Sequence, residues 1–287
     1  MRPDIDAVFD PATNTITYLV ADPATGTAAI IDPVLDYEPK AARLATRSAD
    51  ALLEKVRARG LRLAWVLETH AHADHLSAAD YIRRRTGAKV VIGERIVDVQ
   101  KTFGPLFEAT DVKPDGGDFD HLAKDGERLP LGGLTVEVMH TPGHTPACVT
   151  YVVGDAAFVG DTLFQPDYGT ARCDFPGGDA ATLYRSIRRI LSLPAETRLF
   201  TGHDYLPPAG RKTPAWESTV AQQRADNIHV RDGVGEEAFV ALRRGRDATL
   251  APPVLILPSL QANIRAGALP PPTAEGHVFL RLPLNAI

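Results

Sequence analysis

The sequence predicts an α/β fold, and three observations support this prediction. β-Branched apolar runs alternate with amphipathic stretches of helical period, turn-forming residues separate them, and several of the apolar runs end directly in a His or Asp. The first two runs, residues 15–22 and 27–32, flank a Pro-Ala-Thr-Gly turn and predict an antiparallel hairpin. Ser48 is predicted to cap a helix that ends at Gly60, and residues 61–67 predict a buried strand.

Further elements follow the same pattern through residue 230. Helices are predicted over 78–85, 181–191 and 215–230, and strands over 89–92, 134–139, 156–159 and 199–200. Prolines cluster from residue 251 onward and break the apolar pattern there. We therefore predict one main domain over residues 1–235 and a short C-terminal extension, residues 236–287, packed on the same domain.

The composition excludes several classes of function. The formal net charge of -5 over 287 residues gives no basic surface for a phosphate backbone, so nucleic-acid binding is not expected. No stretch reaches roughly 18 uninterrupted apolar residues and no apolar leader is recognisable, so we expect a cytoplasmic protein that binds no membrane. Cys148 and Cys173 are expected to be free thiols. Whether two chains form a homodimer stays open at this point.

A dense group of metal-ligand residues follows the strand predicted over residues 61–67. His70, His72, Asp74 and His75 lie within one short loop. Four groups that prefer water or a cation cannot share one strand end at low cost unless a polar partner, most simply a metal ion, lies among them. A solvated histidine-rich loop is the weaker alternative for this spacing. The segment therefore predicts a metal site.

Three later strand ends repeat the pattern. His144, Asp161 and His203 each come within a few residues of the end of a predicted strand. A single histidine after a strand is more often a hydrogen-bonded residue than a ligand, and a single Gly-Asp is usually a turn. The three together, in this order after the first group, indicate one site assembled from four strand ends.

These residues resemble the complete ligand set of the metallo-β-lactamase superfamily, over roughly residues 10–230. The resemblance implies an α/β fold of the αβ/βα type, a four-layer sandwich with two sheets face to face, helices outside and metals at one edge of the sheets. In members with two metals, one ion takes the equivalents of His70, His72 and His144, the other takes those of Asp74, His75 and His203, and Asp161 bridges them.

The fold alone does not fix the reaction, and two enzyme classes remain. Glyoxalase II hydrolyses glutathione thioesters with two metals, and persulfide dioxygenase oxidises a thiol-bound persulfide with one iron. Resemblance to the second class implies one Fe(II) per chain, held by His70, His144 and Asp161, with zinc as a substitute in recombinant protein. The remaining ligand-type residues would then orient these ligands and relay protons, or else hold a second metal. They are His72, Asp74, His75 and His203.

Two segments resemble persulfide dioxygenases more than glyoxalase II. Residues 169–175 (GTARCDF) resemble their Gly-x-Gly-Arg-Thr-Asp-Phe, and residues 203–205 resemble their His-Asp-Tyr. Ala171 and Cys173 depart from that pattern and leave the detail of the pocket open. A C-terminal helical domain with basic glutathione-binding residues, as in glyoxalase II, is not recognisable. The chain resembles most closely the bacterial β-lactamase-like hydrolases encoded with sulfide-response genes, a group that itself resembles persulfide dioxygenases.

The resemblance implies that dioxygen oxidises glutathione persulfide, or a related thiol persulfide, to sulfite and the thiol. The predicted catalytic residues are Asp74, Arg172 and Tyr205, and the predicted substrate-binding residues are Arg172, Tyr205, Arg211 and Lys212. A thioester hydrolase of the glyoxalase II type and a non-catalytic metal-dependent sensor of sulfur or oxygen are the alternatives. Metal number and repeated turnover of oxygen discriminate among the three.

Overall fold

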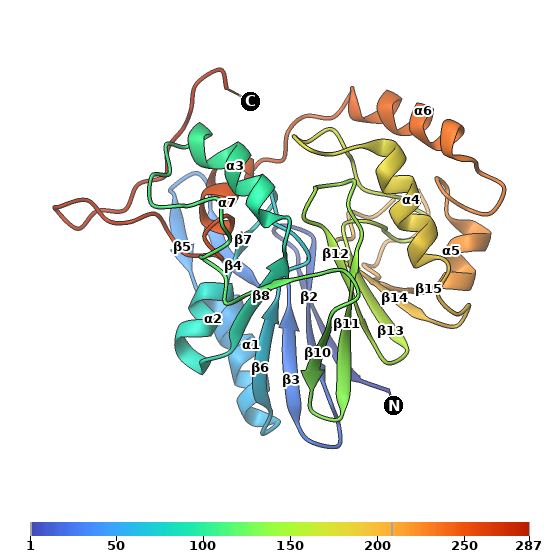
Figure 1. Cartoon of the computed structure of the whole chain (residues 1–287), viewed down its shortest axis with the longest axis horizontal. Coiled ribbons are helices and arrows are strands. Elements are labelled where there is room, and N and C mark those ends of the chain that lie inside the picture. The colour runs from blue at the N-terminus through green and yellow to red at the C-terminus, as the bar shows by residue number, and fades with distance from the viewer. Residues whose placement is uncertain (1, 208, 287) are drawn as a thin grey trace.

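Two six-stranded sheets lie face to face in the computed structural model, and helices cover the outer face of each (Figure 1). The structure describes residues 2–207 and 209–286. The first sheet has the order β1-β2-β3-β6-β8-β9. Its strands are β1 (Asp4–Asp10), β2 (Thr15–Ala21), β3 (Thr27–Ile31), β6 (Arg62–Leu67), β8 (Lys89–Gly93) and β9 (His121–Ala123). Strands β1 to β3 are antiparallel, and β3, β6, β8 and β9 are parallel because helices connect them.

The second sheet has the order β10-β11-β12-β13-β14-β15 and is antiparallel except between β13 and β14. Its strands are β10 (Arg128–Leu131), β11 (Leu134–His140), β12 (Val149–Val153), β13 (Ala156–Gly160), β14 (Arg198–Thr201) and β15 (Glu217–Thr219). A small third sheet, β5-β4-β7, is formed by β4 (Val34–Glu38), β5 (Arg43–Ala45) and β7 (Leu76–Ser77).

The helices divide between the two outer faces (Figure 1). Those behind the first sheet are α1 (Arg47–Ala58), α2 (Ala79–Thr86), α3 (Ile96–Leu106) and α7 (Ile256–Asn263). Those behind the second sheet are α4 (Ala180–Ile190), α5 (Val220–Asp226) and α6 (Glu236–Asp247). The predicted four-layer αβ/βα sandwich is therefore confirmed.

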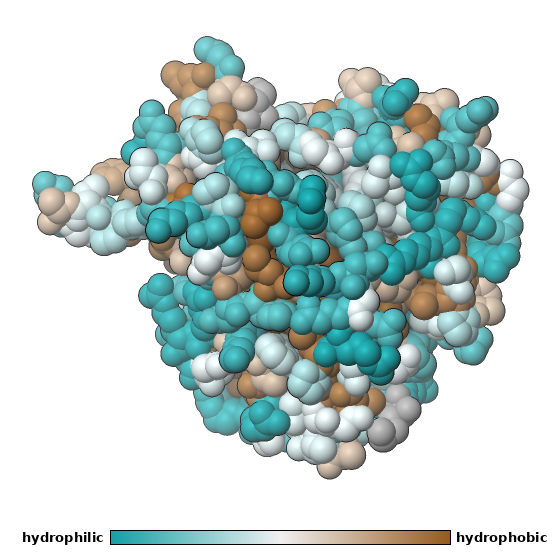
Figure 2. All heavy atoms as spheres, viewed as in Figure 1, coloured by the Kyte–Doolittle hydropathy of each residue, from teal (hydrophilic) through white to brown (hydrophobic). Residues whose placement is uncertain are grey.

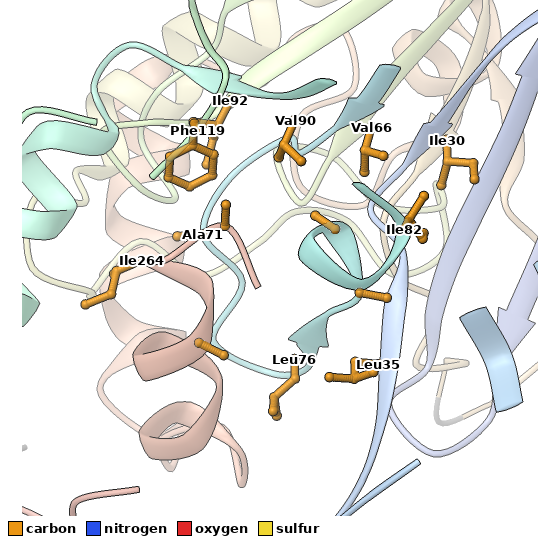
Figure 3. Close-up of a cluster of buried hydrophobic side chains, with 14 of the residues drawn as sticks. Ile30, Leu35, Val66, Ala71, Leu76, Ile82, Val90, Ile92, Phe119 and Ile264 are labelled. Atoms are coloured by element: carbon orange, nitrogen blue, oxygen red, sulfur yellow. The ribbon is translucent and has the colours of Figure 1, made fainter. Parts of the chain in front are cut away.

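Three apolar clusters fill the spaces between these layers. One lies between the sheets, and the others lie between each sheet and its helices. Strand β13 illustrates the reason, because Phe158 points into the cluster between the sheets whereas Ala157 and Val159 contact the helices. In Figure 3, Val66 and Val90 of the first sheet face Ile82 of α2 across the outer cluster.

Two details of the sequence prediction are wrong. The helix predicted over residues 215–230 begins only at Val220, because residues Glu217–Thr219 pair with β14 as an edge strand. Thr219 then caps α5 in a capping box with Gln222. Ser48 caps nothing, because α1 already begins at Arg47 and the Ser48 hydroxyl donates to Asp36.

Two helices within residues 236–287 were not predicted, and both pack on the sandwich. Phe239 of α6 joins the cluster behind the second sheet, and Ile256 and Leu260 of α7 join the cluster behind the first. The chain thus returns across both halves of the sandwich before its final residues (Figure 1). The division of the chain at residue 235 stays a proposal.

Hydrophilic residues cover most of the face shown in Figure 2, and apolar residues are visible near its centre and in several smaller patches. Among the described residues, no helix combines the length and the apolar character needed to cross a membrane.

Candidate metal centre and cleft

Four strand ends bring the seven predicted ligand-type side chains together at one edge of the two sheets. The first four follow β6, and the others follow β11, β13 and β14. Asp74 is 18% exposed at its side chain, and the other six are buried. The seven residues are His70, His72, Asp74, His75, His144, Asp161 and His203.

His70, His144 and Asp161 surround a common gap. The Nε2 atoms of His70 and His144 each lie 3.8 Å from Asp161 Oδ2. Two atoms that each bind one ion at about 2.1 Å are separated by about 3.0 Å at a right angle and by about 4.2 Å on opposite sides. His70 Nε2 and Asp161 Oδ1 are buried and have no hydrogen-bond partner among the described residues. The donor atoms of His70, His72 and Asp161 lie within 4.8 Å of one another, so His72 could contribute to the same site. The unpartnered buried atoms fit a bound cation.

Asp74 and His203 are instead in direct contact. His203 Nε2 lies 2.8 Å from Asp74 Oδ2, but both atoms are buried and neither makes a hydrogen bond among the described residues. His75 Nδ1 lies 3.8 Å from the same oxygen, and Thr15 Oγ1 lies 3.3 Å from His75 Nδ1 and 3.4 Å from His203 Nδ1. The donor atoms of this group and of His72 all lie within 4.8 Å of one another, so the group could also hold a metal.

His72 lies between these two groups and is flanked by two acids that the sequence analysis missed. Its Nε2 lies 3.0 Å from Asp32 Oδ1 and 3.7 Å from Glu68 Oε2, while its Nδ1 lies 4.0 Å from Asp74 Oδ1. Both ring nitrogens of His72 are buried and make no hydrogen bond among the described residues, so either could bind a cation. Asp32 ends a strand as the predicted ligands do, so the same signal could have found it.

Burial shapes the electrostatics of the centre. It raises the pKa of Asp161 to about 7, and it lowers the pKa values of His70 and His144. Burial opposes protonation of His203 too, but Asp161 and Asp74 raise the pKa of His203 to about 10. His70 and His144 are therefore neutral, and the buried carboxylates beside them are not fully balanced by positive charge. Such a set of ligands suits a metal cation.

Two contacts orient the histidines that face the gap. His144 Nδ1 donates to the backbone carbonyl of Arg172 at 2.7 Å, and Thr69 Oγ1 lies 3.0 Å from His70 Nδ1. Each contact occupies the ring nitrogen that points away from Asp161, so the Nε2 atoms are directed into the gap. The contact to Arg172 joins two loops that are far apart in sequence.

Asn263, at the end of α7, holds the loop that carries the first ligands. Its side-chain nitrogen donates to the carbonyls of His72 and His75, both at 2.8 Å, and its oxygen accepts from the backbone N–H of Ser77 at 2.8 Å. All three contacts are buried. The sequence carried no local signal for this residue, because it lies among apolar and proline residues far from the motif.

The centre opens into a cleft with a volume of about 480 Å³. Three of its walls are the β1–β2 turn, the β4–β5 hairpin and the segment between α6 and α7. The predicted residues Asp74, Arg172 and Tyr205 line it, together with His144 and Asp161. The aromatic lining residues are Tyr37, Phe164, Tyr168, Phe175 and Tyr205. The cleft thus brings the site residues together with an aromatic wall formed by these five side chains.

Tyr205 stacks on His203, with ring centroids 5.2 Å apart and an interplanar angle of 13°. Tyr205 is 39% exposed, but desolvation of its hydroxyl, followed by the charge of Asp74, raises its pKa well above the usual value. Its hydroxyl therefore stays protonated at neutral pH and can donate a hydrogen bond within the cleft.

Arg172 uses its guanidinium for the protein itself. Its Nε and Nη2 donate to Asp174 at 2.6 and 2.7 Å, and its Nη1 donates to the Ala251 carbonyl at 2.7 Å. These contacts tie the segment after α6 to the loop that orients His144. The structure brings neither Arg211 nor Lys212 into the cleft lining.

Arg211 forms ion pairs outside the cleft, and these pairs explain why it does not line the cleft. Its guanidinium contacts Asp204, and it donates to Asp167 at 3.0 and 3.1 Å. A guanidinium group that already binds two carboxylates has no N–H donors left for a substrate. Lys212 is exposed on the adjacent surface.

Cys148 and Cys173 are unpaired and buried, as expected. Burial raises both thiol pKa values to about 12. We therefore predict that iodoacetamide at pH 8 leaves both thiols of the folded protein unmodified for an hour, because the thiolate is the reacting form. Mass spectrometry would detect the adducts, and protein unfolded in guanidinium should acquire two. Fast labelling of the folded chain would show that one thiol is accessible and ionised.

Comparisons with known proteins agree with the geometry. A family model described as the metallo-beta-lactamase superfamily matches residues 11–203. A probable metallo-hydrolase of Burkholderia pseudomallei is 55% identical, with 99% of each chain covered. A Dictyostelium discoideum protein named glyoxylase B2 is 46% identical, covering 93% of this chain and 92% of that protein.

Persulfide dioxygenases are also among the similar proteins. The human mitochondrial persulfide dioxygenase ETHE1 is 33% identical, covering 69% of this chain and 67% of that protein. The crystal structure of ETHE1 from Myxococcus xanthus has a TM-score of 0.74 and 31% identity, covering 92% of this chain and all of that one. The predicted resemblance to this group is therefore confirmed.

Proposed function

The chain belongs to the metallo-beta-lactamase superfamily, and within it we propose that the chain is an iron-dependent persulfide dioxygenase. The proposed substrate is glutathione persulfide or a related thiol persulfide. The atoms balance when one persulfide, one dioxygen and one water give one thiol, one sulfite and two protons. Similarity to proteins named persulfide dioxygenase and glyoxylase supports the proposal that the chain is an enzyme. The properties of the metal centre must distinguish a dioxygenase from a hydrolase.

The contrast between the two halves of the centre carries the proposal. His70 Nε2 and His144 Nε2 each lie 3.8 Å from Asp161 Oδ2, which leaves room for an ion. By contrast, Asp74 Oδ2 and His203 Nε2 are only 2.8 Å apart, although these two atoms also lack a hydrogen-bond partner among the described residues. We propose that the first three hold one Fe(II) and that the second position stays without metal. When bound, iron(II) supplies the redox chemistry that activates dioxygen.

The chain's own residues have separate tasks in this proposal. Arg172 and Thr69 orient the metal-binding imidazoles, while the Tyr205 hydroxyl donates a hydrogen bond to the substrate. Burial opposes ionisation of Asp74, but His203 keeps its pKa well below the usual value, so Asp74 stays ionised. It can accept a hydrogen bond from water or substrate in the cleft. The aromatic wall limits the entry of further water.

One helix bears on the comparison with glyoxalase II. Helix α6 lies C-terminal to the metal motifs and carries Arg243 and Arg246 to the cleft. Together with the 46% identity to glyoxylase B2, this makes a two-metal thioester hydrolase the second candidate. The two candidates differ in metal number, since a hydrolase is best served by a hydroxide held between two cations.

The deciding experiment is metal analysis of iron-supplied protein, combined with oxygen uptake on glutathione persulfide. We expect about one iron per chain, repeated turnover, and no oxygen uptake by zinc-loaded protein, because zinc is not redox-active. Replacing Asp74→Ala should leave the iron bound but lower the rate by about 10- to 100-fold.

Two other outcomes would contradict the proposal. Two metals per chain, fast S-lactoylglutathione hydrolysis and no persulfide-dependent oxygen uptake would identify a hydrolase of the glyoxalase II type. Persulfide binding without repeated oxygen consumption would identify a sensor.

A further inference from the structure

We infer that Arg246 of α6 binds a carboxylate of the thiol carrier and thereby selects anionic thiols for the cleft. The inference rests on the proposed function, because it concerns the non-reacting part of the same substrate. The metal-binding end of the cleft takes the sulfur. A charged group elsewhere on the carrier therefore needs a separate partner in the lining.

Arg246 is the charged lining residue whose side chain is left without a partner. The others are Asp74, Asp161, Arg172 and Arg243. The two acids lie against histidines, Arg172 binds Asp174, and Arg243 binds Asp247. The Arg246 guanidinium makes no hydrogen bond or ion pair with any residue in the described part of the chain.

The helix positions Arg246 at the cleft by its register. Phe239, Arg243 and Asp247 form the buried stripe of α6. At about 100° per residue, Arg244 and Arg246 lie on opposite sides of that stripe. Arg246 lines the cleft, whereas Arg244 does not. Both are exposed, so the chain itself supplies a matched control.

The surroundings of Arg246 suit a flexible carrier with a carboxylate. Arg246 and Tyr168 both line the cleft, and the charge of Arg246 opposes the rise that burial causes in the pKa of Tyr168. Leu250 and Leu255 supply apolar contacts on the same wall. An arginine fork beside a phenol can bind a carboxylate by two parallel N–H···O bonds. A peptide thiol such as glutathione has the required chemistry.

Binding of S-methylglutathione to the metal-loaded full chain tests the inference without needing turnover. This ligand keeps both carboxylates of glutathione but cannot form a persulfide. We expect R246Q to weaken its binding by about 5- to 20-fold and R244Q to change it by less than about twofold. Wild type should also bind the ligand more tightly than its diamide, in which both carboxylates are neutralised. R246Q should lose that preference.

The outcomes separate this inference from the proposed function. Equal affinity of R246Q and wild type would overturn the role of Arg246, as would an equal loss in R244Q, since that would indicate general attraction by a basic helix. If the iron protein consumes no oxygen with any persulfide, the proposed function falls, while the binding comparison still decides what Arg246 does. In an active enzyme, R246Q should raise KM for glutathione persulfide and leave kcat within about twofold.

Discussion

Replacing Asp161 by alanine is expected to reduce bound iron to less than about one-tenth per chain and to abolish persulfide-dependent oxygen uptake. Asp161 Oδ2 is the atom that both His70 Nε2 and His144 Nε2 face at 3.8 Å. Two neutral imidazoles without the carboxylate supply no negative charge to a divalent cation. Metal analysis and an oxygen electrode would measure the two losses.

Loss of metal must be separated from loss of fold. Because Asp161 is buried near other acids, its removal should leave the metal-free protein at least as stable in urea as metal-free wild type. Asp167→Ala is the matched control, since Asp167 follows on the same loop but pairs with Arg211 outside the cleft lining. It should keep both iron and activity. An Asp161→Ala protein that retained full iron would refute the proposed ligand set.

A second large effect is expected on stability, at the buried ion pair within α6 that also contacts the loop of Thr170 and Cys173. Arg243 and Asp247 are 2% and 5% exposed, with Arg243 Nη2 2.7 Å from Asp247 Oδ1. Asp247 Oδ2 also accepts the backbone N–H of Cys173 at 3.0 Å. Replacing Asp247→Ala leaves a buried guanidinium without its counter-charge. It should lower the free energy of unfolding by about 3 to 5 kcal/mol.

Urea unfolding of metal-matched samples would measure this loss. The informative control removes both charges, as Arg243→Met combined with Asp247→Leu. This double variant should lose less stability than Asp247→Ala alone, because no uncompensated charge remains buried. A loss below about 1 kcal/mol for Asp247→Ala would mean that water reaches the pair and that α6 is held mainly by Phe239.

The metal-ligand motifs could be predicted from sequence because each is local: a buried strand followed within a few residues by a His or Asp. The two sheets were predicted from the family resemblance rather than from a local pattern, because a strand such as β13 is apolar on both faces and does not show which sheet it joins. The meeting of four strand ends then follows from the topology of the fold. Asp32 had the same signal and was overlooked because a single acid after a strand usually marks a turn.

Other parts depend on contacts that a local pattern does not reveal. The buried face of helix α6 contains the charged residues Arg243 and Asp247, so its sequence resembles that of a solvent-exposed helix face. Helix α7 buries Ser259, Gln261 and Asn263 and includes a proline in its first turn, where proline is tolerated. Strand β15 has only three residues and exists through its pairing with β14. Arg246 became a candidate only once the position of α6 was known.

The two hydrogen bonds from Asn263 to the carbonyls of His72 and His75 bear on the order of events during synthesis. A ribosome makes the motif loop early, but the residue that fixes its backbone is made almost two hundred positions later. The growing chain therefore exposes a histidine-rich loop before it has the final shape for its metal. We therefore expect this loop to reach its final backbone geometry only after α7 has docked.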